Sequence, residues 1–117
     1  MAEGISWQIK VKAYRALPHL VEAARAGTTL TYKELGEKIE LHHRPLRYAL
    51  DFIRDDICRR HGLPLLNSIV VNGDTGEPGD GWLPDGVHAD LSEEQARVRA
   101  LADWDAKLKE FGFSASQ

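Results

Sequence analysis

The fold of this 117-residue chain is decided by the stretch TYKELGEKIELHHRPLRYALDFIRDDICRR, residues 31–60. Thr31 and Glu34 form a capping box, in which the threonine hydroxyl accepts from the Glu34 amide while the glutamate reaches back. This pattern predicts a helix of about two turns from Tyr32 to Glu40. Leu35 and Ile39 lie on one face of that helix and give it a side to bury.

A second helix is predicted directly after the first. Leu41-His42-His43 makes a tight connection, and Arg44-Pro45 opens a helix that should run to about Arg60, stopped by Gly62. At about 100° per residue the helix is amphipathic. Its apolar face holds Leu46, Ala49, Leu50, Ile53 and Ile57, and its opposite face holds Arg44, Arg47, Asp51, Arg54, Asp55 and Cys58.

The segment before this helix pair is apolar and ambiguous. Ile5, Trp7, Ile9 and Val11 alternate with polar residues at strand period, but an apolar series at helix period also runs through the region. We favour a helix within residues 6–26 that is interrupted or restarted near Pro18 and ends before Gly27.

The segment after the pair predicts a small β wing and a last helix. The β-branched run from Leu65 to Val71 indicates a strand, the turn residues from Asn72 to Gly81 a wing loop, and Trp82-Leu83 a second short strand. A capping box of Ser92 and Gln95 begins a helix expected to end near Phe111. The predicted fold is therefore mainly α with a small β wing, a winged helix–turn–helix.

Length and composition fit one domain, residues 1–117, with a core over about 7–111 and a flexible tail at 114–117. The single cysteine cannot form an internal disulfide. No signal peptide or membrane-length apolar run is visible, so we expect a cytoplasmic protein with no membrane partner.

Charge is unevenly divided along the chain. The net charge is −3, but residues 1–63 carry 11 Lys/Arg against 8 Asp/Glu, net +3, and residues 64–117 carry 4 against 10, net −6. The basic part coincides with the predicted helix–turn–helix, so this part is the one that could face phosphates.

Several short motifs resemble the DNA-binding domain of alkylguanine-DNA alkyltransferases and alkyltransferase-like proteins. They are Thr31-Tyr32-Lys33-Glu34-Leu35, Arg44-Pro45-Leu46-Arg47-Tyr48-Ala49-Leu50, Leu63-Pro64-Leu65-Leu66 and Ile69-Val70-Val71. The resemblance covers about residues 17–82. It implies that Tyr32 crowds a DNA phosphate, that Arg44 enters the duplex in place of an extruded base, and that the helix after Arg44 lies in the minor groove.

The chain departs from that family where alkyl transfer takes place. The alkyltransferases carry proline-cysteine-histidine-arginine before the double valine, whereas this chain has Leu66-Asn67-Ser68-Ile69. Transfer needs an activated thiolate, and Cys58 lies on the preceding helix. The alkyltransferase-like proteins also lack the cysteine and bind a flipped damaged base.

The candidate DNA contacts are Tyr32, His42, His43, Arg44, Arg47 and Arg54. Arginines on one helical face can contact phosphates or base edges, and the two histidines fall at the turn that meets the DNA backbone. The alternative is an ordinary solvated face, because Asp51 and Asp55 stand among the arginines and can balance them locally.

Other chemistry is poorly supported by the sequence. Cys58 and His61 supply only two of the four ligands of a structural zinc site, and Ser68 has no nucleophile elbow around it. The 72–81 loop lacks the lysine and helix entry of a phosphate loop, and its acidic residues disfavour phosphate. We therefore expect no metal, no cofactor and no enzymatic activity.

Two functional hypotheses follow from the sequence. The first is a DNA-binding winged helix, an accessory or regulatory factor that contacts double-stranded DNA. The second is a protein-interaction module on the same scaffold, with a protein partner or a homodimer. The acidic C-terminal part, the unusual wing, and the segments around Trp7 and Trp104 favour the second.

Overall fold

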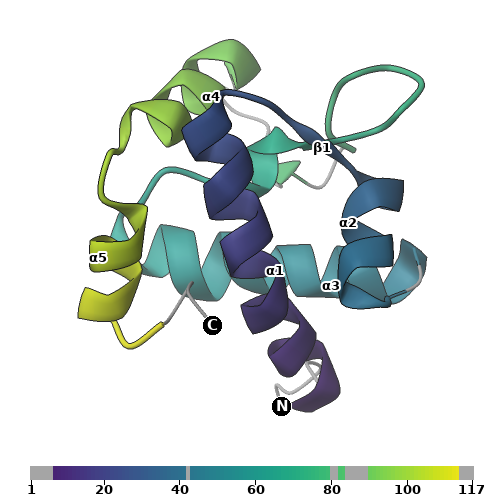
Figure 1. The fold of residues 1–117 in the computed structure, drawn as a ribbon, viewed down its shortest axis with the longest axis horizontal. Helices are drawn as coiled ribbons and strands as arrows, with labels where there is room; N and C mark the ends of the chain where they lie inside the picture. Colours follow the sequence, from purple (N-terminus) through teal and green to yellow (C-terminus); the bar gives the residue numbers. More distant parts are fainter. Residues whose placement is uncertain (1–6, 42, 80–81, 84–89, 114–117) are drawn as a thin grey trace.

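The computed structural model describes residues 7–41, 43–79, 82–83 and 90–113 (Figure 1). The expected flexible tail at 114–117 lies outside them. The elements in chain order are α1 (Trp7–Ala26), β1 (Leu30–Thr31), α2 (Tyr32–Ile39), α3 (His43–Phe52), a π-helical segment (Ile53–Cys58), a 3₁₀ turn (Arg59–His61), a second 3₁₀ turn (Leu66–Ile69), β2 (Val70–Val71), α4 (Leu91–Ala100) and α5 (Trp104–Glu110).

Helix α1 is central and packs against α2, α3 and α4 (Figure 1). It is one continuous helix that contains Pro18, so the expected interruption there is wrong. Proline removes one backbone hydrogen bond, but Leu17 and Leu20 on either side are fully buried and hold the helix together through packing. The expected end before Gly27 is confirmed, because this glycine has a φ of 74°.

The predicted capping box starts α2. The Glu34 amide donates to Thr31 Oγ1 at 3.0 Å, and the Thr31 amide donates to Glu34 Oε1 at 2.9 Å. Glu40, in the left-handed region with a φ of 58°, ends the helix. Gly36 permits the tight turn that follows, because a Cβ atom there would stand 2.7 Å from the Leu41 carbonyl oxygen.

The second predicted helix is helical over nearly the expected range, but it is not α-helical throughout. After Phe52 the chain continues as a π-helical segment and then as a 3₁₀ turn that Gly62 ends in the left-handed region. Since π-helical bonds join residues five apart, Ile53 and Cys58 come to lie on the same buried side. The placement of Cys58 on the solvent face is therefore wrong.

The β structure is smaller than expected and does not form the predicted wing. Leu66–Ile69 is a 3₁₀ turn, and only Val70–Val71 is extended. This strand pairs in parallel with β1, Leu30 opposite Val70 and Thr31 opposite Val71. Trp82 lies in a turn, not in a second strand of a hairpin. The mainly helical class with a small sheet is confirmed; the hairpin is not formed by the described residues.

The predicted last helix is broken into α4 and α5. Leu101 is extended, and the break lets Trp104 enter the core, where its indole Nε1 donates to the Val98 carbonyl at 2.8 Å. Asp90 caps α4 by accepting from the Glu93 amide. The expected capping box of Ser92 with Gln95 is therefore wrong, and the Gln95 amide instead donates to the Ser68 carbonyl.

One apolar core joins all the helices. It includes Leu17, Leu35, Ile53, Val98 and Leu108, one from each of five helical segments. Among the described residues, no helix has the combination of length and apolar character that crossing a membrane requires.

Candidate nucleic-acid interface

The outward face of α3 carries a basic and an aromatic side chain at consecutive positions, Arg47 and Tyr48. Leu46 and Ala49 are buried against the core, whereas Arg47 and Tyr48 between them are exposed. The helix begins at His43, directly after the tight turn from α2. His42 and the side chains of His43 and Arg44 lie outside the described part of the structure.

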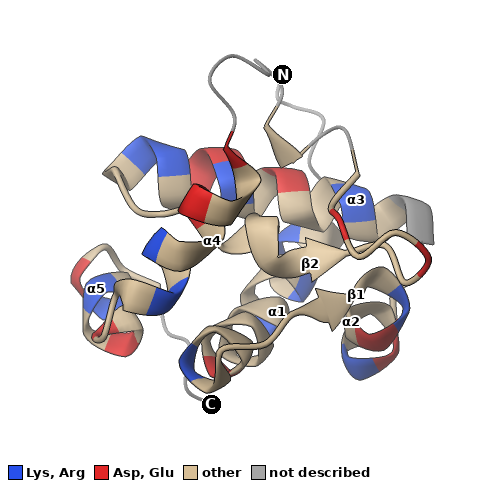
Figure 2. Cartoon of the chain, turned by 90° about the horizontal axis from the view of Figure 1, so that it is seen from above, with Lys and Arg blue, Asp and Glu red and all other residues tan. Residues whose placement is uncertain are grey.

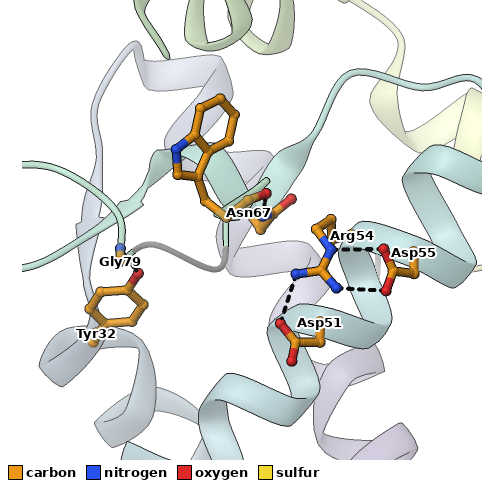
Figure 3. A network of polar contacts seen from close by, with 7 residues as sticks. Tyr32, Asp51, Arg54, Asp55, Asn67 and Gly79 are labelled. Atoms are coloured by element: carbon orange, nitrogen blue, oxygen red, sulfur yellow. Dashed lines mark hydrogen bonds and ion pairs between the residues drawn. The ribbon is translucent and has the colours of Figure 1, made fainter. Parts of the chain in front are cut away.

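Arg54 does not belong to this exposed face. Only 8% of it is exposed, because the π-helical segment turns it toward the body of the protein (Figure 3). Its guanidinium donates to Asp55 at 2.7 and 2.6 Å and to Asp51 Oδ1 at 3.0 Å. The expectation that Arg54 shares the exposed face with Arg47 is therefore wrong, and its contact with phosphate stays a prediction that these ion pairs disfavour.

This network shifts the pKa values of Arg54 and Asp55. The hydrogen bond from Arg54 holds the pKa of Asp55 below its ordinary value, although partial burial opposes the shift. The same bond, with the nearby carboxylate charges, raises the pKa of Arg54. Asp51 and Asp55 are thus both paired with Arg54, whose single positive charge offsets one of their two negative charges.

Tyr32 lies at the start of α2 and is half-buried. Its hydroxyl accepts a hydrogen bond from the Gly79 amide at 2.6 Å (Figure 3). This bond joins α2 to the end of the acidic loop at 72–79. Within the loop, the Asn72 amide donates to the Glu77 carbonyl at 2.8 Å, which closes the turn. The sequence placed Tyr32 at the interface but did not foresee its loop partner.

The surface of α2 carries both signs of charge (Figure 2). Lys33 and Lys38 are exposed, as are Glu34 and Glu37. Glu34 is engaged in the cap. Lys12 of α1 donates to the carbonyl oxygens of Ile39 and Glu40, where it meets the negative end of the α2 dipole. The two lysines and two glutamates give α2 no net charge, so we assign the cation of the candidate interface to Arg47 of α3.

The segment that would hold the alkyltransferase thiol is packed inside the protein. Asn67 donates to the Trp82 carbonyl at 2.9 Å, and Ser68 is fully buried with no hydrogen-bond partner for its Oγ among the described residues. Cys58 is also buried, and desolvation raises the pKa of its thiol to about 12. Neither Ser68 nor Cys58 has the activated environment of a nucleophile.

The remaining polar candidates have structural partners. The His61 ring stacks on Phe111 with ring centres 4.3 Å apart, and no cluster of metal ligands occurs in the ranges that the structure describes. Trp104, offered above in favour of a protein interface, is buried.

Sequence reasoning missed Tyr48, which is 51% exposed beside Arg47. Its signal was present: Tyr48 follows Arg44 by four residues, and residues at that spacing share a helix face. It also missed Gly36. The requirement for glycine there comes from the close approach of the Leu41 carbonyl oxygen, which the structure shows and the sequence pattern does not.

Comparison with protein-family models, with curated proteins and with solved structures finds no match to the chain. The alkyltransferase resemblance therefore depends on the quoted motifs alone.

Proposed function

We propose that the protein binds double-stranded DNA through α2 and α3, as a non-catalytic factor of helix–turn–helix type related to winged-helix domains. The observation that supports this most directly is the outward face of α3. Arg47 and Tyr48 are exposed there on a helix whose other side is anchored in the core. A helix that is packed on the core and presents a cation on its exposed side suits a DNA groove.

The internal pairing of Arg54 supports the proposal in a second way. Asp51 and Asp55 stand one and two turns after Arg47 and would repel phosphates if unpaired. Because Arg54 bonds to both of them, its charge offsets one of their two negative charges, and they repel phosphates less than two unpaired carboxylates would. Arg47 then positions the helix on phosphates or base edges, and Arg44 acts beside it as the resemblance implies.

The experiment is a fluorescence-anisotropy titration of labelled duplex DNA with the wild type and with Arg47→Ala. Loss of one arginine contact at a base edge should weaken binding about fivefold or more, and Arg44→Ala combined with Arg47→Ala should weaken it further. Arg99→Ala is the matched control, because Arg99 is exposed on α4, across α1 from α2 (Figure 1). Equal affinities for the double variant and the wild type would exclude this interface.

A protein-interaction role is the second candidate, favoured by Trp7, which is 73% exposed. Tryptophan is enriched in protein–protein interfaces relative to the rest of the surface. Light scattering of the protein, alone and with duplex DNA, separates the two roles. A stable dimer without duplex binding at moderate salt would favour the protein-interaction role.

A further inference from the structure

The first half of α1 combines exposed aromatic rings with basic residues. Trp7, Lys10 and Tyr14 follow one another at helix spacing and share a face. Trp7 is 73% and Tyr14 is 37% exposed. From Trp7 to Val21 this helix contains no acidic residue.

A second row of aromatic rings lies on α3 and meets the first. Tyr48 and Phe52 are four residues apart, and Tyr48 is 51% exposed. The Phe52 ring packs edge-on to Tyr14, with ring centres 5.8 Å apart, and Lys10 Nζ lies 6.0 Å from the centre of the same ring. The two rows therefore join at Phe52. Phe52 itself is buried, with 6% exposed, so the exposed rings are those of Trp7, Tyr14 and Tyr48. We call Trp7, Lys10, Tyr14 and Tyr48, joined through Phe52, the aromatic face.

The charge around the aromatic face is mainly positive. Arg15 is exposed next to Tyr14, and Arg47 is exposed next to Tyr48. On α3 and its continuation the nearest carboxylates in sequence are Asp51 and Asp55, which both pair with Arg54, and Asp56, one turn beyond Phe52. The face thus offers rings for stacking with cations beside them.

We propose that the aromatic face binds single-stranded nucleic acid by stacking unpaired bases on Trp7 and Tyr48. Aromatic side chains interleaved with lysine and arginine are the chemistry that recognises unpaired bases and their phosphates together. Bases in a duplex cover each other's faces, so a ring can stack only on a base that has left its pair. The positive charge around the face favours an anionic ligand, such as nucleic acid, over an apolar peptide.

The single-strand site overlaps the proposed duplex interface on α3, where Arg47 and Tyr48 are neighbours, but the two functions are tested through different residues. Single-strand binding depends on Trp7 and Tyr48, whereas duplex binding depends on Arg44 and Arg47. Either function can therefore fail in experiment without the other.

The test is an anisotropy titration of the full chain with three labelled probes of equal length, about ten nucleotides. They are oligothymidylate, oligouridylate and an abasic deoxyribose-phosphate oligomer. We expect both base-containing probes to bind and the abasic probe to bind much more weakly. Trp7→Ala and Tyr48→Ala should each lower affinity for oligothymidylate by about fivefold or more. Both side chains are exposed, so neither change should disturb the fold.

Two conservative variants are the matched controls. Trp7→Phe and Tyr48→Phe keep a ring and should retain most of the affinity. Three results would overturn the proposal: equal binding of the abasic probe, no loss in the alanine variants, or no binding of oligothymidylate by the wild type. A dimer that Trp7→Ala dissociates would also overturn it, because the face would then be covered by a second copy of the chain.

Discussion

The thiol of Cys58 is fully buried, although Arg54, Asp55 and Asp56 precede it in the same π-helical segment. Its position follows from the π-helical segment, which brings it under the same cover as Ile53. Desolvation is the largest cause of its high pKa, and Glu94 adds to the shift. A thiol in this environment stays protonated over the physiological range and is inert.

We predict that Cys58 does not react with iodoacetamide at pH 8 in the native protein and reacts readily in guanidinium chloride. The folded pKa of about 12 lies above the unfolded value of about 8.5. The stabilisation from the neutral buried thiol is therefore fully present below pH 8.5 and is lost as pH rises toward 12. Mass spectrometry measures the alkylation. Rapid labelling of the native protein would contradict the burial.

Arg54, like Cys58, lies on a different side of its helix from the one that an α-helical pattern predicts. Arg47 and Arg54 are seven residues apart, and an α-helical pattern places them on one face. The structure exposes the first and pairs the second with two carboxylates. A cation is available to a ligand only where the protein has not already neutralised it.

At the scale of elements, the start of α2 is the simplest to test. We predict that Thr31→Ala lowers the free energy of unfolding by about 1 kcal/mol, because the Glu34 amide loses the hydroxyl that satisfies it. Thr29→Ala is the matched control, since Thr29 is exposed in the link before β1. Urea denaturation measures both. Equal losses would show that the capping bond adds nothing specific.

The elements that could be predicted from sequence are those fixed by neighbours in the chain. The capping box of Thr31 and the stops at Gly27 and Gly62 depend on residues within one turn. The π-helical segment and the break at Leu101 depend on distant packing. Trp104, for example, leaves the helical path to reach the Val98 carbonyl and the core. No local pattern encodes such a choice.

The candidate interface divides in the same way. The exposure of Arg47 follows from the helix period, and the turn between α2 and α3 follows from the residues between the two predicted helices. The engagement of Tyr32 with Gly79 joins residues 47 positions apart, and the sheet at that place pairs strands that the sequence did not connect. The predicted hairpin fails for this reason: β2 finds its partner in β1 and not in the loop that follows it.

At the scale of the whole molecule, the acidic C-terminal part limits how strongly DNA can be held. The net charge is −3, so the protein as a whole does not attract phosphates. Attraction must come from the few cations at the α2–α3 interface. Duplex binding should therefore depend on salt only moderately.

We predict a slope of about −2 for the logarithm of duplex affinity against the logarithm of salt concentration, as expected if Arg44 and Arg47 neutralise about two phosphates. Affinity should then fall about tenfold between 50 and 200 mM salt. Titrations at four salt concentrations measure the slope. A slope steeper than about −5 would mean that lysines such as Lys33 and Lys38 also contact DNA, contrary to the proposed interface.

The parallel pairing of β1 with β2 also constrains the order in which the chain folds. The pair joins residues 30 and 70 and so closes a loop of about forty residues that contains α2 and α3. Closing a flexible loop of this size costs about 3 kcal/mol in entropy, more than two residues of strand on each side can offset. The helices must therefore collapse onto α1 first and shorten the loop. We therefore expect the sheet to be the last part of the fold to form and the first to open, although both residues of β2 are buried in the core.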